Sequence, residues 1–227
     1  MSQAFFDRMA PEAAREINQL SRTIFELRES RKRILDTYAM VDENALLSAI
    51  EHDRINEHPG YEHYLSARIL ADAHQDARRQ LMPGGRETPP ATLHLAFVAS
   101  VGARFGEHLA EPVTLLQDAM RIVLDNGATL TVRIAAADAF SLEWAYDDRN
   151  YRIDTAPRHD TSRTANGDDS ESPTHGKPGC AHVHVPGGAV LSDPYGLPLG
   201  DAEATLFDFI EKVLADPDPV PDPGDTL

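Results

Sequence analysis

The chain has 227 residues, 41% hydrophobic and 26% charged, which is typical of a globular protein of one or two domains and excludes a wholly disordered chain. Its net charge of −16 weakens any account in which long-range attraction draws the protein to nucleic acid. The sequence shows no apolar run near the roughly 18 residues that span a bilayer, no signal peptide and only one cysteine, so we expect a cytoplasmic protein with no membrane partner.

The first part of the chain predicts a helical module. Residues 11–40 are typical of one long helix with a heptad seam, in which Arg31 interrupts a line of apolar or aromatic side chains at steps of three and four: Ile17, Leu20, Ile24, Leu27, Ile34 and Tyr38. Two interpretations fit the seam. It favours a two-stranded parallel coiled coil, and it equally suits a hairpin with a later helix of the same chain.

Two further helices follow in the predicted module. Asp42 is a candidate N-cap of a short helix that ends near Asp53, and a third helix starts after His58-Pro59-Gly60 and ends at Met82. The Pro- and Gly-rich residues 83–90 predict a domain boundary. We therefore expect residues 1–85 to form one helical module that serves dimerisation or partner docking.

After the boundary the pattern predicts an antiparallel sheet. The expected strands are Leu93–Val98, Val113–Leu116, Met120–Leu124, Thr129–Ile134, Phe140–Tyr146, Tyr151–Asp154 and His182–Val185. Asn126-Gly127 supplies the positive φ that a tight hairpin turn requires. A final helix is expected from about Asp201 to Ala215.

The predicted fold class is therefore α+β, with the helical module joined to a small antiparallel sheet domain over residues 91–216. Residues 160–179 contain no large apolar groups and are expected to form a mobile loop. Residues 217–227 are rich in Pro and Asp and are expected to form a disordered acidic tail.

Candidate chemistry gathers near the C-terminal end. His159, His175, His182 and His184 lie within 26 residues, with Cys180 among them. On an extended strand, positions 180, 182 and 184 project to one face. Three interpretations compete: His159, His182 and His184 act as general acids and bases of a metal-independent ribonuclease; His175, Cys180, His182 and His184 bind zinc; or the histidines are solvated and carry no chemistry.

Residues 118–215 also resemble the TumE-type toxins of toxin–antitoxin systems. The similarity lies in the order of the segments LDNGATLTVRI, SLEWAYDD, RIDTAPRHDT, HVHVPGG and TLFDFIEKVL. The resemblance implies that Asp154, His159, His182 and His184 occupy the polar motif positions of the family. Where the family often has adjacent histidines, this chain has Arg158-His159, which leaves a cation suited to phosphate.

The resemblance implies a toxin or defence-associated effector that cleaves RNA. In this hypothesis one of His159 and His182 deprotonates the 2′-hydroxyl, another histidine protonates the leaving oxygen, and Arg158 stabilises the phosphorane, with no cofactor. The alternative is a non-catalytic adaptor with an optional zinc site. Residues 11–82 would dock an antitoxin, a larger complex or a second copy of the chain.

The site hypothesis carries a structural expectation. The strand that ends at Asp154 must lie beside the strand of His182, and Asp154 then orients an imidazole. His182 is expected at the rim of the sheet domain, so that His182→Ala leaves the fold intact.

Overall fold

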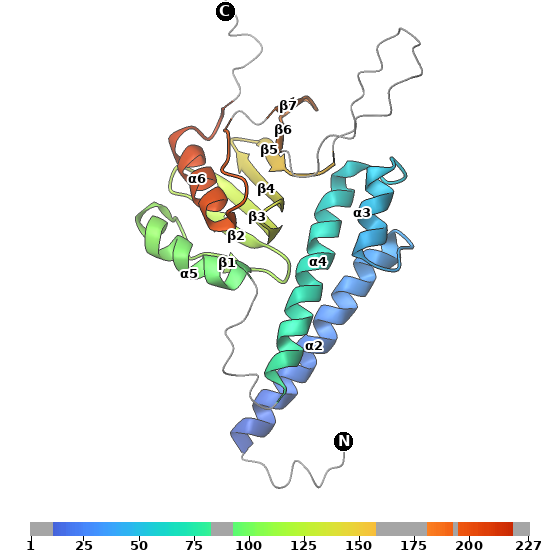
Figure 1. Ribbon diagram of the computed structural model, residues 1–227. Helices are drawn as coiled ribbons and strands as arrows, with labels where there is room; N and C mark the ends of the chain where they lie inside the picture. The colour runs from blue at the N-terminus through green and yellow to red at the C-terminus, as the bar shows by residue number, and fades with distance from the viewer. Residues whose placement is uncertain (1–10, 83–92, 158–180, 193–194, 220–227) are drawn as a thin grey trace, which may run out of the picture.

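The computed structural model describes residues 11–82, 93–157, 181–192 and 195–219. Its architecture is α+β, as expected: an N-terminal helical region, a seven-stranded antiparallel sheet and a C-terminal helix. Figure 1 shows the helical hairpin on one side of the sheet and helices α5 and α6 on the other. Within the described ranges, none of the helices is both long and apolar enough to span a membrane.

The N-terminal hairpin is built from α2 (Pro11–Thr37) and α4 (Glu57–Gln80), joined through the short helix α3 (Glu43–Glu51). Asp42 caps α3 as expected, because its carboxylate accepts a hydrogen bond of 2.8 Å from the backbone nitrogen of Ala45. Regular helical geometry in α4 resumes after His58 and Pro59, whose backbone is not helical.

Part of the heptad seam of α2 packs against α4 inside this hairpin, where Leu27 is buried and the other seam residues are partly buried. Leu27 packs with Leu70 and Ala77 of α4, and Leu20 and Ile24 of the seam pack against the same cluster. Of the two interpretations that the sequence allowed, the structure shows the intramolecular hairpin. Docking of a second copy or a partner by residues 11–82 stays a prediction.

The expected strand at Leu93–Val98 is wrong, because this segment opens the helix α5 (Leu93–Phe105). The buried side chains of α5 are His94, Phe97, Val101 and Phe105, which recur at helical spacing. The first six residues alternate like a strand, and the helical period becomes visible only when the whole segment is considered. A short 3₁₀ helix, η2 (Gly106–His108), follows.

The sheet is a meander, in which each strand pairs with the next in the chain. Its strands are β1 (Thr114–Leu115), β2 (Met120–Val123), β3 (Thr129–Ala136), β4 (Ala139–Tyr146), β5 (Arg149–Asp154), β6 (His182–His184) and β7 (Val190–Ser192). The turn between β2 and β3 is the one expected, with Gly127 at φ 93° and the Asn126 side chain accepting a hydrogen bond from Ala128 N.

The two faces of the sheet differ in chemistry. One face is apolar and forms the main core with α5 and with α6 (Ala202–Ala215); Trp144 belongs to it, stacked on Tyr151 at 4.8 Å between ring centroids. The other face is polar at its β5–β6 end and is approached there by α4. Trp144 is therefore a core residue.

The chain beyond α6 is bound to the sheet for a short distance. Pro217 O accepts a hydrogen bond of 2.9 Å from the Trp144 indole, and Asp218 forms a 2.7 Å ion pair with Arg149. Pro217 and Asp218 thus differ from the disordered tail expected from residue 217. The rest of that tail from residue 220, the boundary at 83–90 and the loop at 160–179 lie outside the described residues.

Candidate metal centre

Strand register brings three of the predicted site residues together. Asp154 on β5 pairs with His182 on β6, and Arg152 pairs with His184. Because alternate side chains of a strand share a face, Asp154, His182 and His184 all project to the polar face, whereas Val183 projects into the apolar core. The two imidazole centroids lie 4.8 Å apart. The expected neighbourhood of the Asp154 and His182 strands is confirmed.

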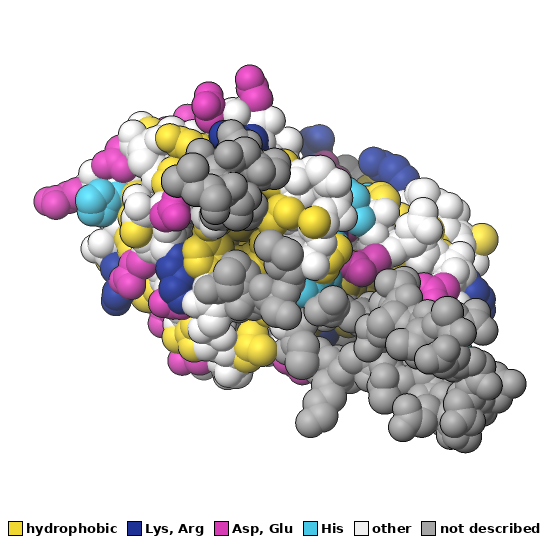
Figure 2. Space-filling model, turned by 90° about the horizontal axis from the view of Figure 1, so that it is seen from above, with side chains coloured by type: hydrophobic (Ala, Val, Ile, Leu, Met, Phe, Trp, Pro, Cys, Tyr) yellow, Lys and Arg dark blue, Asp and Glu magenta, His cyan; other side chains and the backbone are white. Residues whose placement is uncertain are grey.

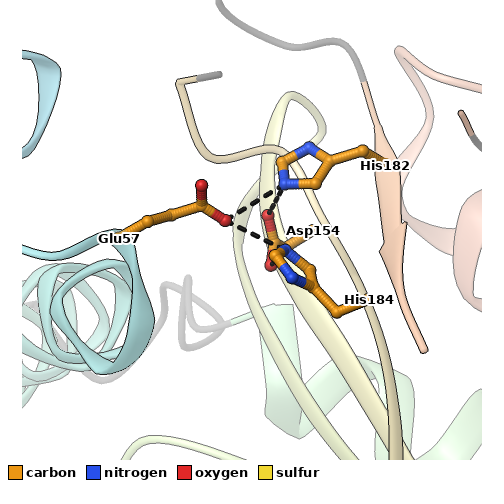
Figure 3. A group of neighbouring side chains, drawn as sticks. All are labelled: Glu57, Asp154, His182 and His184. Atoms are coloured by element: carbon orange, nitrogen blue, oxygen red, sulfur yellow. Dashed lines mark hydrogen bonds and ion pairs between the residues drawn. The ribbon is translucent and has the colours of Figure 1, made fainter. Parts of the chain in front are cut away.

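A fourth side chain comes from the helical hairpin. Glu57, in the first turn of α4, extends toward the two imidazoles from the opposite side (Figure 3). Its Oε1 lies 3.1 Å from Nε2 of His182 and 2.9 Å from Nε2 of His184. The site therefore joins the start of α4 to the two strands β5 and β6.

The four side chains converge on one small region. Nε2 of His182 lies 3.3 Å from Asp154 Oδ1, and Nε2 of His184 lies 3.5 Å from Asp154 Oδ2. One ligand atom from each of the four residues lies within 4.8 Å of the others. A tetrahedral zinc site with bonds of about 2.0–2.1 Å has donors about 3.3 Å apart along each edge. The distances from the two imidazole nitrogens to Glu57 Oε1, 3.1 and 2.9 Å, are near that edge, and those to Asp154, 3.3 and 3.5 Å, involve its two different oxygens. The four side chains are therefore close enough to share one ion.

Burial increases toward the sheet. The side chains of His182 and Asp154 are 0% and 1% exposed, whereas those of His184 and Glu57 are 23% and 24% exposed. Among the described residues, His184 Nε2 is a buried nitrogen without a well-aligned hydrogen bond, although two carboxylate oxygens lie within 3.5 Å. A cation held between these imidazole nitrogens and carboxylate oxygens would be bound by both kinds of ligand.

The two carboxylates respond differently to their surroundings. Burial alone would raise the pKa of Glu57, but the hydrogen bond from His182 and the charges of the imidazoles outweigh it and hold this pKa well below its ordinary value. Burial raises the pKa of Asp154, and the charges of His182 and Arg152 oppose only part of the rise. The ionised form of the more enclosed Asp154 therefore needs neighbouring cations more than the ionised form of Glu57 does.

Arg152 organises the acidic side of the site. Its Nε donates to Asp154 Oδ2 at 2.6 Å, and its Nη1 donates to Glu62 Oε1 at 2.7 Å. The backbone nitrogen of Ala156 donates to the other Asp154 oxygen at 3.0 Å. Both oxygens of Asp154 are therefore oriented by donors from its own strand and its continuation, as the carboxylate ligands of metal sites commonly are.

Two features determine how closely the start of α4 approaches the sheet. The Tyr61 hydroxyl and the Thr155 hydroxyl form a buried hydrogen bond of 2.9 Å, one turn along α4 from Glu57. A Cβ atom at Gly60 would lie 2.9 Å from Cγ2 of Ile55, in the connection between α3 and α4, so a larger residue at position 60 would force this connection or the start of α4 to shift. Together these contacts fix the position from which Glu57 reaches the imidazoles.

The structure differs from the sequence hypothesis in two respects. His182 is completely buried between the strands and α4, so its expected position at the rim is wrong. Glu57 was not predicted, because its separation of 125 residues from His182 leaves no local motif, and an acidic residue in a first helical turn is ordinary.

The remaining predicted residues are not placed. Arg158, His159, His175 and Cys180 lie outside the described residues. Of the proposed catalytic set, the structure therefore brings Asp154, His182 and His184 together, and of the proposed zinc ligands only His182 and His184.

Comparison with protein families, with curated proteins and with solved structures finds no match to this chain.

Proposed function

We propose that this protein binds one divalent transition-metal ion, zinc, through His182, His184, Asp154 and Glu57. The convergence of two imidazole nitrogens and two carboxylate groups, with one ligand atom from each within 4.8 Å of the others, is the observation that carries the proposal. Imidazole ligands favour zinc over magnesium and calcium, which prefer sets made only of oxygen. The ligand set differs from the one suggested by the sequence, since it uses carboxylates in place of His175 and Cys180.

A bound cation would balance the negative charge of the site. With neutral imidazoles, the carboxylates of Glu57, Asp154 and Glu62 face the guanidinium of Arg152, so this group of described residues carries an excess of negative charge in a largely buried position. A divalent ion balances that excess. It also links the start of α4 to β5 and β6, and so holds the helical hairpin against the sheet.

Zinc titration of the metal-free full-length chain by calorimetry tests the proposal. We expect one equivalent per chain, lost in His182→Ala and Asp154→Ala. The exposed His52, at the end of α3, gives a matched control, and His52→Ala should bind like the wild type. Cys180→Ala and His175→Ala should also bind normally. Loss of zinc in Cys180→Ala, or no binding by the wild type, would contradict the proposed ligands.

A second candidate function is the TumE-like effector that cleaves RNA. It is supported by the ordered motifs of residues 118–215 and by the proximity of Asp154, His182 and His184, three residues to which the resemblance assigns roles. The face seen in Figure 2 gives RNA no strong attraction, since its Lys and Arg side chains lie singly or in small groups among acidic ones.

Inducible expression tests the effector function. We expect the wild type to arrest growth and degrade cellular RNA, and Asp154→Asn and His184→Ala to do neither at equal protein level. His52→Ala is again the matched control. Growth arrest by both Asp154→Asn and His184→Ala would show that the toxic activity does not depend on this site. In that case the non-catalytic adaptor, with the helical hairpin as its docking element, becomes the leading function.

A further inference from the structure

Resting on the proposed metal site, we infer that Glu57 is an exchangeable ligand and that its position on the metal is taken by an oxyanion, such as a phosphate or carboxylate group. Asp154, His182 and His184 then form the permanent part of the site. On exchange, the bond from the metal to Glu57 Oε1 breaks and a bond to an oxygen of the anion forms, with no change of oxidation state.

The three permanent ligands share a rigid support. Asp154 on β5 is directly paired with His182 on β6, and His184 lies two residues farther along β6 on the same face. Asp154 and His182 are completely buried. Asp154 is further fixed by the hydrogen bonds from Arg152 and Ala156. Two histidines and one carboxylate on one side of a metal leave the opposite side open for a further ligand.

Glu57 lacks comparable support. Its side chain is 24% exposed, and among the described residues its closest cation apart from the imidazoles is Arg152, with Nη2 at 3.7 Å from Oε1. The residue before it, Asn56, forms no side-chain cap, and His58 and Pro59 after it have non-helical backbone. Glu57 thus belongs to an irregular first turn. Its side chain and the backbone around it can move without breaking the backbone hydrogen bonds of the regular part of α4.

The chemistry of the position defines what can replace Glu57. The carboxylate of Glu57 is an anionic oxygen ligand held near two imidazoles and a guanidinium. A group that takes its place must offer an anionic oxygen and must reach the site from the partly exposed side of Glu57 and His184. Phosphate and carboxylate groups share this chemistry, and both are small enough to replace a side-chain carboxylate.

Cobalt-loaded full-length protein gives a direct readout, because the visible absorption of Co²⁺ reports its ligand number and symmetry. Glu57→Ala removes only the exchangeable ligand, and Glu203→Ala is a matched control, since Glu203 is an exposed glutamate in the first turn of α6. Asp154→Ala removes a permanent ligand. Each protein is titrated with cobalt, and the loaded forms are then titrated with inorganic phosphate and, separately, acetate, with chloride as the ionic-strength control. Circular dichroism verifies that each variant is folded.

We expect Glu57→Ala to bind cobalt within about tenfold of the wild-type affinity and Asp154→Ala to lose at least about a hundredfold. Phosphate, acetate or both should change the Glu57→Ala spectrum at a concentration at least about tenfold lower than in the wild type, because no side chain competes for the position. The anion that responds identifies the ligand.

Three results would overturn the inference. Equal loss of cobalt in Glu57→Ala and Asp154→Ala would make Glu57 a permanent ligand and the site a closed four-ligand centre, with the proposed metal binding intact. A spectrum insensitive to both anions in Glu57→Ala would remove the oxyanion position. A wild-type chain that binds no cobalt or zinc would refute the metal centre itself.

Discussion

His182 shows how much the site depends on mutual compensation between residues. A fully buried imidazole beside the fully buried carboxylate of Asp154 is costly to desolvate, and each group offsets the cost of the other. Arg152 extends the same compensation to Glu62. Removing one member therefore affects the fold as well as the site, in contrast to the harmless substitution that the sequence suggested.

The His182→Ala and His184→Ala variants should separate these effects. In the metal-free protein we expect His182→Ala to lower the free energy of unfolding by about 1–3 kcal/mol, because it leaves buried Asp154 without its nearest imidazole. His184 is 23% exposed, so His184→Ala should cost less. Urea denaturation of both variants measures the difference. A larger loss in His184→Ala would contradict the assigned burial.

His94 provides a prediction of pH dependence away from the site. It is buried under the sheet, and its Nε2 accepts a hydrogen bond of 3.0 Å from the backbone nitrogen of Ile134. Burial lowers the pKa of His94 to about 4 from its ordinary 6.5. Between these values only the unfolded chain binds the proton, so this residue makes stability fall as the pH is lowered from 6.5 toward 4, by up to about 3 kcal/mol.

Substitution of His94 by a residue that does not titrate isolates this contribution. Urea unfolding of wild type and His94→Gln at pH 7 and pH 4.5 should show a smaller pH-dependent loss in the variant. The same loss in both proteins would mean that His94 is protonated in the fold or does not accept the Ile134 hydrogen bond.

Three of the four site residues could be predicted at the residue scale because strand alternation is a local rule. Positions 182 and 184 share a face of any strand, and the expected neighbouring strand ended at Asp154. Glu57 could not be predicted, since its contact with the imidazoles depends on how α4 sits on the sheet. That arrangement follows from dispersed contacts, such as Tyr61 with Thr155, which leave no pattern in the sequence.

At the scale of elements, the spacing of apolar residues predicted helix or strand correctly where the segment was long or was bounded by a clear turn sequence. The helices of the hairpin and the strands on both sides of Asn126-Gly127 were predicted in type and approximate bounds. Leu93–Val98 was assigned wrongly because six residues with alternating apolar positions fit a strand as well as they fit the start of α5.

The hairpin of α2 and α4 leads to a stability prediction with an internal control. Leu27 is 7% exposed and packs with Leu70 and Ala77, so Leu27→Ala should lower the free energy of unfolding by about 2–4 kcal/mol. Phe25, on the same helix, is 55% exposed, and Phe25→Ala should change stability by less than about 1 kcal/mol. Thermal or urea denaturation measures both.

The comparison of Leu27→Ala with Phe25→Ala also tests whether α2 packs only within its own chain or also contacts a second chain. If the Phe25→Ala variant were the more destabilised of the two, or if its mass in solution fell relative to that of the wild type, the exposed side of α2 would be part of an interface between chains. The helical module would then act as the docking element that the sequence suggested.

For the molecule as a whole, the metal centre couples two parts that are distant in the sequence. Three ligands belong to the sheet and one to the hairpin, so metal binding should stabilise their contact. At a free zinc concentration about 100 times the dissociation constant, the free energy of unfolding should rise by about 2.7 kcal/mol. Hydrogen exchange should slow together at the start of α4 and in β6. Slowing confined to β6 would show that the hairpin does not contribute a ligand.

X-ray absorption at the zinc edge of the loaded full-length chain identifies the ligands of the proposed centre directly. We expect nearest neighbours of nitrogen and oxygen only, at about 2.0–2.1 Å, with the multiple-scattering signature of two imidazoles. A sulfur neighbour at about 2.3 Å would place Cys180 in the site and would contradict the centre formed by Glu57, Asp154, His182 and His184.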